Sequence, residues 1–386
     1  MAQPTALPQQ QIPDGGEFLL LPPTLQPYAY SNVDRMFATR AITRGPRPRT
    51  LPRGSEISPR YAEGGVERGV DEYFHRACVA GLLVLKRGKI VLERYSLGLR
   101  EDTRWSSMSM VKSLTSTLVG AALRDGAIGS LDDKVSTYVP AVRGSAYDQV
   151  SIRHLITMSS GVAWSEDYVD RDSHVNQYSR SLGAKVPGGV LALLRTLGAE
   201  HAPGSQFRYN TGDTYLLGCL LTAATGETLA SYMSRKIWAP FGMEFDAYYT
   251  LESDDGQEIG GSRAGMALRD FGRFGQFILE GGRMGDTAVL PDDWVSNAAT
   301  PAFTLDASQN SWGATGYGYS WWLDDSGAMV AVGFAGQSLY IDRTEELVVV
   351  TLSCQPQPPY AAAYGIDMRT ERRAFLRGVT ETLRGA

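Results

Sequence analysis

The chain has few of the residues that cross-link a small domain or bind a metal. Only Cys78, Cys219 and Cys354 occur among its 386 residues, an odd number at wide spacing. This pattern is typical of free thiols and argues against a disulfide framework or a zinc knuckle. The four histidines form no His-x-x-x-His pair, and the single Glu-x-x-His, Glu72 to His75, has no second copy. We therefore predict no metal and no other cofactor.

Long hydrophobic runs and an excess of one charge are also lacking, and we expect no secretory signal. The longest apolar runs, such as 81–85 and 347–352, fall far short of the roughly 20 residues of a membrane span. Lys and Arg number 37 against 42 Asp and Glu, and a net charge of −5 does not suggest a partner nucleic acid or membrane surface. Residues 1–11 have neither the basic nor the apolar region of a secretory signal. We expect a cytoplasmic globular protein that acts on a small neutral substrate, and a homodimer stays open.

Prolines separate the first sixty residues from the rest. Residues 1–60 are rich in proline and polar residues, which disfavour regular elements, so we expect an extended arm over the surface. Two β-rich runs, 81–86 and 89–95, flank Arg87-Gly88 and predict an antiparallel hairpin.

Helical patterns fill the middle of the chain, and strand patterns return near its end. Residues 152–259 are predicted to form helices and loops, including a long run over 214–238 closed by Pro240. The later strands are expected at 317–323, 329–332, 338–341 and 347–353, before a final helix over 370–384.

Hairpins at both ends around a helical middle predict an α+β protein. Both ends complete one antiparallel sheet flanked by helices, and an all-α domain is inserted between them. The expected limits are an arm over 1–60, an α/β domain over 61–152 and 265–386, and an all-α domain over 153–264.

One serine and one lysine are spaced for nucleophilic catalysis. Of six lysines, only Lys112 follows a serine, Ser109, by three positions. Apolar residues recur at helical spacing over 110–124, so the two side chains share one face at the start of a mostly buried helix. The helix dipole disfavours a cation in that turn and stabilises an oxyanion, which favours a neutral amine that takes the serine proton. Alternatively, Ser109 only caps the helix.

Two further segments carry candidate chemistry. Tyr209 lies at a loop-to-helix boundary, where its phenol can relay protons if Lys112 lowers its pKa; alternatively it packs an edge. The stretch Val332 to Gln337 contains Gly333, and an edge-strand amide there can complete an oxyanion hole with the Ser109 amide. A simple strand bend is the alternative.

The order of these features resembles the serine β-lactamase-like, penicillin-recognising hydrolases over residues 78–355. Hairpin, Ser-x-x-Lys helix, the segment 153–161, Tyr209 and the glycine-spaced strand follow one another in that order. The run 166–170 and the pairing of Tyr209 with Gly336-Gln337 are most similar to the 6-aminohexanoate-dimer hydrolases and the family VIII carboxylesterases.

The resemblance implies roles for several residues. Ser109 would be the nucleophile, Lys112 its base and Tyr209 the proton shuttle to the leaving group, while the amides of Ser109 and Phe334 would bind the oxyanion. Tyr168 would contact the substrate. Small carboxylic esters and short linear amides would be hydrolysed through an acyl-enzyme.

Three differences from these families limit the range of substrates that the resemblance implies. By alignment Ala331 to Gly333 stands where penicillin-recognising relatives carry Lys-Thr-Gly, which leaves Gly333 beside the substrate without the cation. Thr211 stands where their Tyr-x-Asn motif ends. The resemblance also implies that Ser179 stands where the nylon-oligomer hydrolases have an acidic residue that favours amino-bearing substrates, which argues against efficient hydrolysis of that linear amide. β-Lactamase or D-Ala-D-Ala peptidase activity and a non-catalytic binding module stay as alternatives. An α/β-hydrolase is rejected, because Gly-x-Ser-x-Gly is absent.

Overall fold

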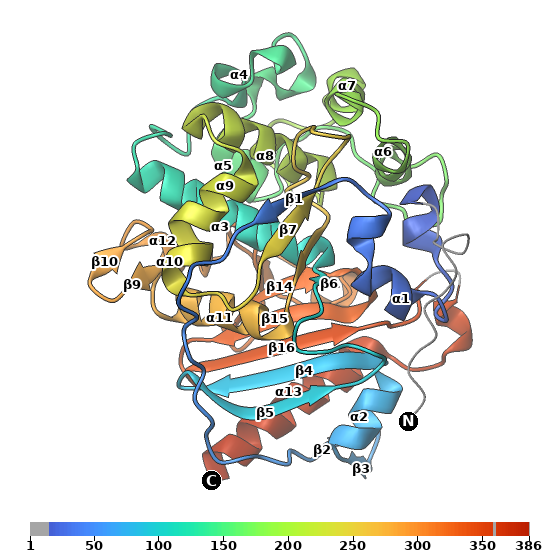
Figure 1. The fold of residues 1–386 in the computed structure, drawn as a ribbon. Coiled ribbons are helices and arrows are strands. Elements are labelled where there is room, and N and C mark those ends of the chain that lie inside the picture. Colours follow the sequence, from blue (N-terminus) through green and yellow to red (C-terminus); the bar gives the residue numbers. More distant parts are fainter. Residues whose placement is uncertain (1–14, 358–359, 386) are drawn as a thin grey trace.

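An eight-stranded antiparallel sheet forms the base of the molecule in the computed structural model, which describes residues 15–357 and 360–385 (Figure 1). In spatial order its strands are β11 (Phe303–Thr304), β12 (Gly316–Tyr317), β13 (Trp322–Leu323), β14 (Met329–Gly333), β15 (Gln337–Asp342), β16 (Leu347–Ser353), β4 (Val79–Lys86) and β5 (Lys89–Tyr95). The predicted hairpin is confirmed as β4 and β5, and both Arg87 and Gly88 adopt positive φ at its turn. Strand β16 pairs with β4, so both ends of the chain complete one sheet, as the sequence predicts.

The strand expected at 317–323 is instead a tight hairpin of β12 and β13. Ser320 takes a φ of 58°, and the Gly318 amide donates to the Trp321 carbonyl, which reverses the chain between the two short strands. The prediction of one continuous strand over 317–323 is therefore wrong.

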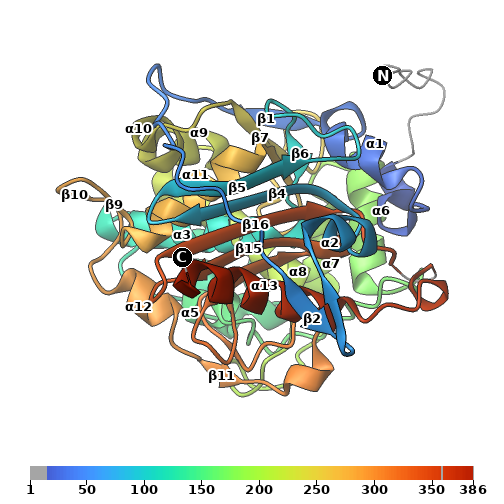
Figure 2. The same ribbon diagram turned by 90° about the horizontal axis from the view of Figure 1, so that it is seen from below.

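Helices cover both faces of the sheet. Strand β4 is apolar from Val79 to Leu85 because Leu83 and Leu85 face one layer while Leu82 and Val84 face the other. On the first face lie α3 (Val111–Arg124) and α11 (Leu268–Leu279). On the second lie α2 (Val70–Arg76) and α13 (Met368–Gly385), seen in front of the sheet in Figure 2, beside the small hairpin of β2 (Tyr61–Glu63) and β3 (Val66–Arg68).

Helices from the middle of the chain form a layer above α3 (Figure 1). They are α4 (Val135–Tyr138), α5 (Ile152–Ile156), α6 (His174–Gly183), α7 (Gly189–Thr196) and α8 (Thr211–Thr225). The chain continues through α9 (Leu229–Met233) and a π-helical turn at Ser234–Trp238 into α10 (Ala239–Phe241), which lies lower than α3 in that view. The run expected over 214–238 is broken, because α8 ends where Gly226 adopts a φ of 69°. Pro240 lies inside α10 and does not close the run.

A second sheet of four strands departs from the all-α expectation for residues 153–264. Its order is β1 (Thr39–Ile42), β7 (Ala247–Thr250), β8 (Ala264–Met266) and β6 (Trp105–Ser106). Strand β7 is a fully buried run of Ala, Tyr, Tyr and Thr, which suits a strand covered on both faces.

The N-terminal segment is not an extended surface arm over its described part. It contains α1 (Gln26–Ser31) and β1, and β1 pairs in antiparallel register with β7. Phe18, Tyr30 and Phe37 are buried in the main core. Proline does not prevent this, because Pro27 occupies the first turn of α1, where its missing N–H needs no partner. The first 14 residues of the expected arm lie outside the described residues.

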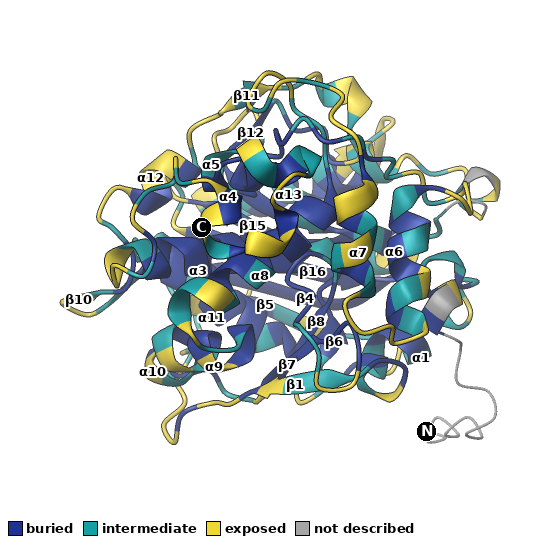
Figure 3. Ribbon diagram, turned by 90° about the horizontal axis from the view of Figure 1, so that it is seen from above, coloured by how far each residue is buried: buried dark blue, intermediate teal, exposed yellow. Residues whose placement is uncertain are grey.

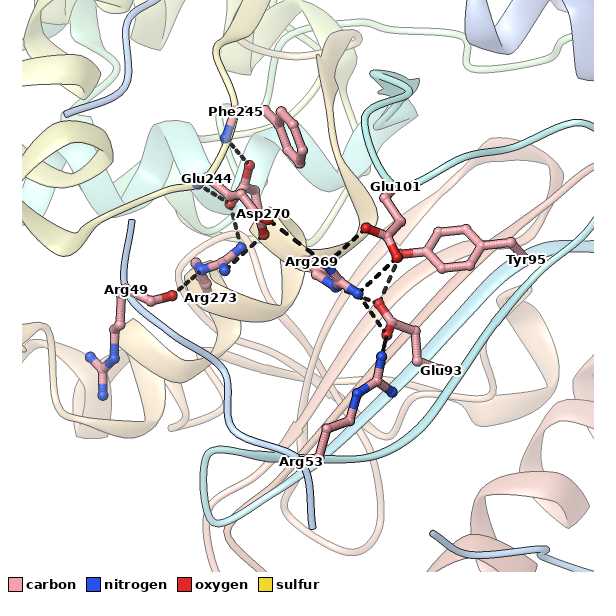
Figure 4. A network of polar contacts seen from close by, with 10 residues as sticks. All are labelled: Arg49, Arg53, Glu93, Tyr95, Glu101, Glu244, Phe245, Arg269, Asp270 and Arg273. Atoms are coloured by element: carbon pink, nitrogen blue, oxygen red, sulfur yellow. Dashed lines mark hydrogen bonds and ion pairs between the residues drawn. The ribbon is translucent and has the colours of Figure 1, made fainter. Parts of the chain in front are cut away.

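A polar network anchors α11 to its surroundings (Figure 4). Arg269 donates to both oxygens of Glu93 on β5, at 2.6 and 3.0 Å, and also pairs with Glu101. One turn later, Arg273 donates to Asp270 at 2.9 Å and to the Arg49 carbonyl at 2.9 Å. Since Glu93 and Asp270 are buried carboxylates, these arginines fix the position of α11 and of β8, which precedes it.

Exposed residues gather on the outer helices and loops, while the sheet strands and α3 are largely buried (Figure 3). Within the two described ranges, every helix is too short or too polar to cross a bilayer.

Candidate active site

Ser109 lies in a tight 3-10 turn, Met108–Met110, that leads directly into α3. Met108 adopts a φ of 47°, a left-handed conformation that is costly for a residue with a side chain. Ser107 stabilises this turn, because its hydroxyl donates to the Met108 carbonyl at 2.9 Å and accepts from the Ala264 amide at 2.9 Å. Ser109 makes no capping hydrogen bond to the helix, which removes the alternative role of a cap.

Lys112 is fully buried one turn beyond Ser109, on the same face of the helix, as its spacing predicts. Its Nζ donates to Ser109 Oγ at 2.9 Å, to Thr211 Oγ1 at 3.0 Å and to the Gly261 carbonyl. Burial lowers the pKa of Lys112 to about 8, and the nearby charge of Glu166 partly opposes this. The amine is therefore able to change its protonation state near neutral pH while touching the serine hydroxyl.

Glu166 is a site residue that the sequence analysis did not single out. Its Oε1 accepts from the Thr211 hydroxyl and from the Tyr168 hydroxyl, and its Oε2 accepts from the Trp164 indole and the Thr211 amide. Thr211 thus links the Glu166 carboxylate to Lys112 through one hydroxyl. The only signal was that Glu166 opens the run 166–170, in which the resemblance drew attention to Tyr168.

Tyr209 immediately precedes Asn210, the N-cap of α8, at the predicted loop-to-helix boundary, and the Asn210 side chain caps the helix by accepting from the Asp213 amide. Its ring stacks on Trp322 with centroids 5.5 Å apart, and the Lys112 Nζ lies 4.9 Å from the ring centroid. The expectation that Lys112 lowers the Tyr209 pKa is wrong. Burial raises the pKa of Tyr209, Glu166 raises it further, and the contact with Ser109 opposes them only partly. The phenol is a proton donor at neutral pH.

Gly333 and Phe334 approach the serine from the end of β14. Strand β14 is not an edge strand by order, but β13 pairs only with Met329 and Val330, so the following residues are uncovered on that side among the described strands. A Cβ on Gly333 would lie 2.6 Å from the Ser107 carbonyl, so only glycine permits this approach.

Gln337 holds the turn that carries Phe334. Its fully buried side chain donates to the Phe334 carbonyl at 3.0 Å and to the Ser353 carbonyl at 2.7 Å. Its Oε1 accepts from the Trp105 indole at 3.0 Å. This amide therefore joins β15, β16 and β6 behind the site.

Two cavities meet at Ser109. We call the first, of about 30 Å³, the inner cavity; it is lined by Ser109, Glu166, Tyr168, Ser179, Ser262, Arg263 and Phe334, among others. The second, the outer cavity, has a volume of about 790 Å³ and is lined by Ser109, Tyr168, Tyr209, Gly333 and Phe334 together with residues of the C-terminal region.

The structure brings together the residues that the sequence singles out, but on different sides of Ser109. Ser179, on α6, faces only the inner cavity, whereas Tyr209 and Gly333 face only the outer one. Tyr168 and Phe334 line both cavities, and their rings are in contact, with centroids 4.8 Å apart.

The fold, with a serine and a buried lysine one helical turn apart, defines the class of the protein as the serine hydrolases with a β-lactamase-like fold. The sequence model of the Beta-lactamase family matches residues 67–369, well over half of the chain, and the chain belongs to that family of hydrolases.

Relatives and solved structures agree with this assignment. The 6-aminohexanoate-dimer hydrolase of Paenarthrobacter ureafaciens is 28% identical over 309 residues, covering 77% of this chain and 78% of the relative. A structure from Bacillus anthracis, provisionally described as a 6-aminohexanoate-dimer hydrolase, superposes with a TM-score of 0.83 at 20% identity and covers 100% of this chain and 99% of its own. A family VIII carboxylesterase gives a TM-score of 0.59 at 15% identity, covering 79% and 97%. At these identities the two structures show a shared fold.

Proposed function

We propose that the protein hydrolyses small carboxylic esters and short linear amides through an acyl-enzyme on Ser109. The observation that carries this proposal is the 2.9 Å contact between Ser109 Oγ and a buried lysine whose pKa is about 8. A hydroxyl becomes a useful nucleophile when an adjacent base accepts its proton, and Lys112 is the base in reach.

The proposed reaction begins when neutral Lys112 takes the Ser109 proton and Oγ attacks the substrate carbonyl carbon. The amides of Ser109 and Phe334 would hold the resulting oxyanion. The carbonyl of Gly261 and the hydroxyl of Thr211 stabilise the new ammonium, because both already accept from Nζ.

Tyr209 would complete the first half of the reaction. As the tetrahedral intermediate collapses, the phenol protonates the leaving alcohol or amine and is reprotonated from Lys112, which becomes neutral again. Water then attacks the acyl carbon, Lys112 takes the water proton, and the carboxylic acid leaves as Ser109 regains its hydrogen.

The absence of a lysine in the run Ala331 to Gly333 supports esters and linear amides over penicillins or peptidoglycan peptides. That cation is the group with which the penicillin-recognising relatives would grip a substrate carboxylate beside this strand. The name of the Paenarthrobacter relative supports linear amides as a second substrate class.

The test compares wild type with Ser109→Ala on p-nitrophenyl esters, the linear 6-aminohexanoate dimer and nitrocefin. Wild type should hydrolyse esters best, and a fluorophosphonate should add its mass to the intact protein. The alanine variant should lose both turnover and labelling while its thermal unfolding stays close to that of wild type. Ester turnover by the alanine variant near the wild-type rate would refute the mechanism, and an unlabelled, inactive wild type would favour a binding module.

A further inference from the structure

Arg263 is a buried cation in the active-site region that the proposed reaction does not use. It precedes β8, is 2% exposed, and lies between two rings, with Cζ 4.8 Å from the Phe18 centroid and 4.1 Å from the Phe37 centroid. Among the residues that the structure describes, its guanidinium has no ion-pair partner, and its Nε and Nη2 have no acceptor.

A buried guanidinium without an acceptor is expensive, because it loses its hydration and regains no hydrogen bond. Burial lowers the pKa of Arg263 to about 10, with the Tyr178 phenol opposing this, so the group is still a cation at neutral pH. Arg273, a buried arginine of α11, shows the usual solution, since it pairs with Asp270 and Glu244. Arg263 therefore presents an unused positive charge.

Arg263 is one of the residues that line the inner cavity, and Ser109 lines the same cavity. Ser179 lines the same cavity, and its Oγ is buried without a partner among the described residues, which leaves a second free donor. Ser262 is already paired with Tyr178, at 2.9 Å. Glu166 also lines the cavity, but both of its carboxylate oxygens already accept hydrogen bonds, from Thr211, Tyr168 and Trp164.

The size of the inner cavity limits what can fill it. A volume of about 30 Å³ exceeds the ~10–15 Å³ that one water needs and suits a group of a few atoms such as a single carboxylate. A planar carboxylate also matches the forked donors of a guanidinium.

We propose that the inner cavity binds a carboxylate of the substrate on Arg263 and Ser179, so that the preferred substrates are esters or amides that carry a free carboxylate. This inference rests on the proposed function, which supplies the reaction. The charge of the substrate is inferred from Arg263. The inference departs from the small neutral substrate expected from composition. It also explains why Ser179 is not acidic, because an aspartate at that position would itself pair with Arg263 and compete with the substrate carboxylate.

The experiment measures kcat/KM for three ethyl esters of matched length that differ only at the far end of the acyl chain. Monoethyl adipate ends in a carboxylate, ethyl hexanoate in a methyl group and ethyl 6-aminohexanoate in an ammonium. Release of acid is followed in a pH-stat. We expect the carboxylate ester to be preferred and the ammonium ester to be the poorest substrate.

Arg263→Met removes the charge and keeps an unbranched side chain between the rings of Phe18 and Phe37. It should lower the adipate-to-hexanoate ratio by about tenfold or more, whereas Arg263→Lys should keep a larger part of that ratio. The matched control is Arg372→Met. Arg372 is also buried, lies over Trp312 and lines the outer cavity; its Nη2 donates to a carbonyl at 2.8 Å, and its Nε has no partner among the described residues.

The control variant distinguishes binding of the carboxylate in the inner cavity from binding in the outer cavity. If Arg372→Met lowers the ratio and Arg263→Met does not, the carboxylate binds in the outer cavity and the proposal is wrong. Wild-type preference for hexanoate, or for the ammonium ester, also overturns it.

Binding is measured separately from turnover, so that failure of the reaction does not hide the answer. Calorimetry of hexanoate and the neutral 1-hexanol with wild-type protein should show tighter binding of hexanoate, and Arg263→Met should abolish the difference. Equal binding of the acid and the alcohol overturns the proposal even if esters are hydrolysed. Hexanoate binding without any ester turnover supports the anion site and counts against the proposed function alone.

Discussion

Lys112 and Tyr209 respond to burial in complementary ways. Removal from water disfavours the charged form of either group, which lowers the pKa of the ammonium to about 8 and raises that of the phenol. Their neutral forms are an amine that accepts a proton and a phenol that donates one. The same desolvation thus separates a base from an acid within one site.

The pH dependence of acylation follows from the lysine. Because only the neutral amine accepts the serine proton, kcat/KM for an uncharged ester should rise with pH and level off above pH 8. Below about pH 7 the rate should fall roughly tenfold for each pH unit. Initial rates on p-nitrophenyl acetate from pH 5.5 to 9.5, corrected for buffer hydrolysis, measure this. The rate of fluorophosphonate labelling should follow the same curve, and a flat profile would exclude Lys112 as the base.

Tyr209→Phe should affect amides more than activated esters. An amine must be protonated as it leaves, whereas p-nitrophenolate leaves unprotonated. We expect a loss on the order of a hundredfold for the linear 6-aminohexanoate dimer and less than about tenfold for p-nitrophenyl acetate. Both rates are measured on one preparation of the variant, so a loss of folded protein would lower them equally. Similar losses on both would reduce Tyr209 to a residue that positions the substrate.

Helix α8 joins the site to the buried interior through its first turn. Thr211 and Asp213 both lie in this turn, and Asp213 accepts from the Tyr147 hydroxyl at 2.9 Å. Burial raises the pKa of Asp213 to about 7, which the hydrogen bonds of Ser160 and Tyr147 partly oppose. The element that positions Tyr209 therefore contains a carboxyl group that is costly to ionise.

This carboxyl group predicts a loss of stability as the pH rises. Between the unfolded pKa, near 3.8, and about 7, the folded chain keeps a proton that the unfolded chain has released. The free energy of unfolding should fall across this window by at most about 4 kcal/mol. Urea unfolding of wild type and Asp213→Asn at pH 4.5, 6 and 8 tests it. The asparagine variant should be the more stable of the two at pH 8.

Asp292→Asn serves as the control for that series, because Asp292 is 82% exposed. It should leave the difference between pH 4.5 and pH 8 as in wild type. If Asp213→Asn leaves it unchanged too, Asp213 is not the group that titrates.

Across the whole molecule, the described part of the N-terminal segment belongs to the core. The Tyr30 ring packs edge-on against Trp105, with centroids 5.8 Å apart, and also contacts Phe18. Strand β6, which contains Trp105, leads through Ser107 into the turn that carries Ser109. The segment therefore supports the base of the active site.

Tyr30→Ala should lower the free energy of unfolding by about 3–5 kcal/mol, because it leaves a ring-sized cavity in the core. Tyr30→Phe is the matched control. It removes only a hydroxyl that has no partner among the described residues, so stability should change by less than about 0.5 kcal/mol. Guanidinium unfolding of both variants measures the difference. A surface arm would instead tolerate alanine as well as phenylalanine.

Local patterns in the sequence were sufficient for the hairpin β4–β5, for α3 and for the pairing of Ser109 with Lys112. Each depends on neighbours close in the chain: a turn with glycine, an apolar stripe, and two side chains three residues apart. The sheet that closes between β4 and β16 was also predictable, because strand patterns stand at both ends of the chain.

Other features were decided only when distant segments came together. Glu166 and Thr211 reach Lys112 from loops and helices far along the chain, and no spacing predicts that contact. The direction of the Tyr209 pKa depends on burial, which a sequence pattern does not measure. Nothing in the sequence distinguishes Arg263 from the other arginines, and only the fold buries it between Phe18 and Phe37, without an ion-pair partner among the described residues. The sequence by itself therefore determined the type of reaction that we propose, because that depends on residues close together in the chain. Only the tertiary structure determined the charges in the site, because the surrounding residues decide how far each group is desolvated and whether it has an ion-pair partner.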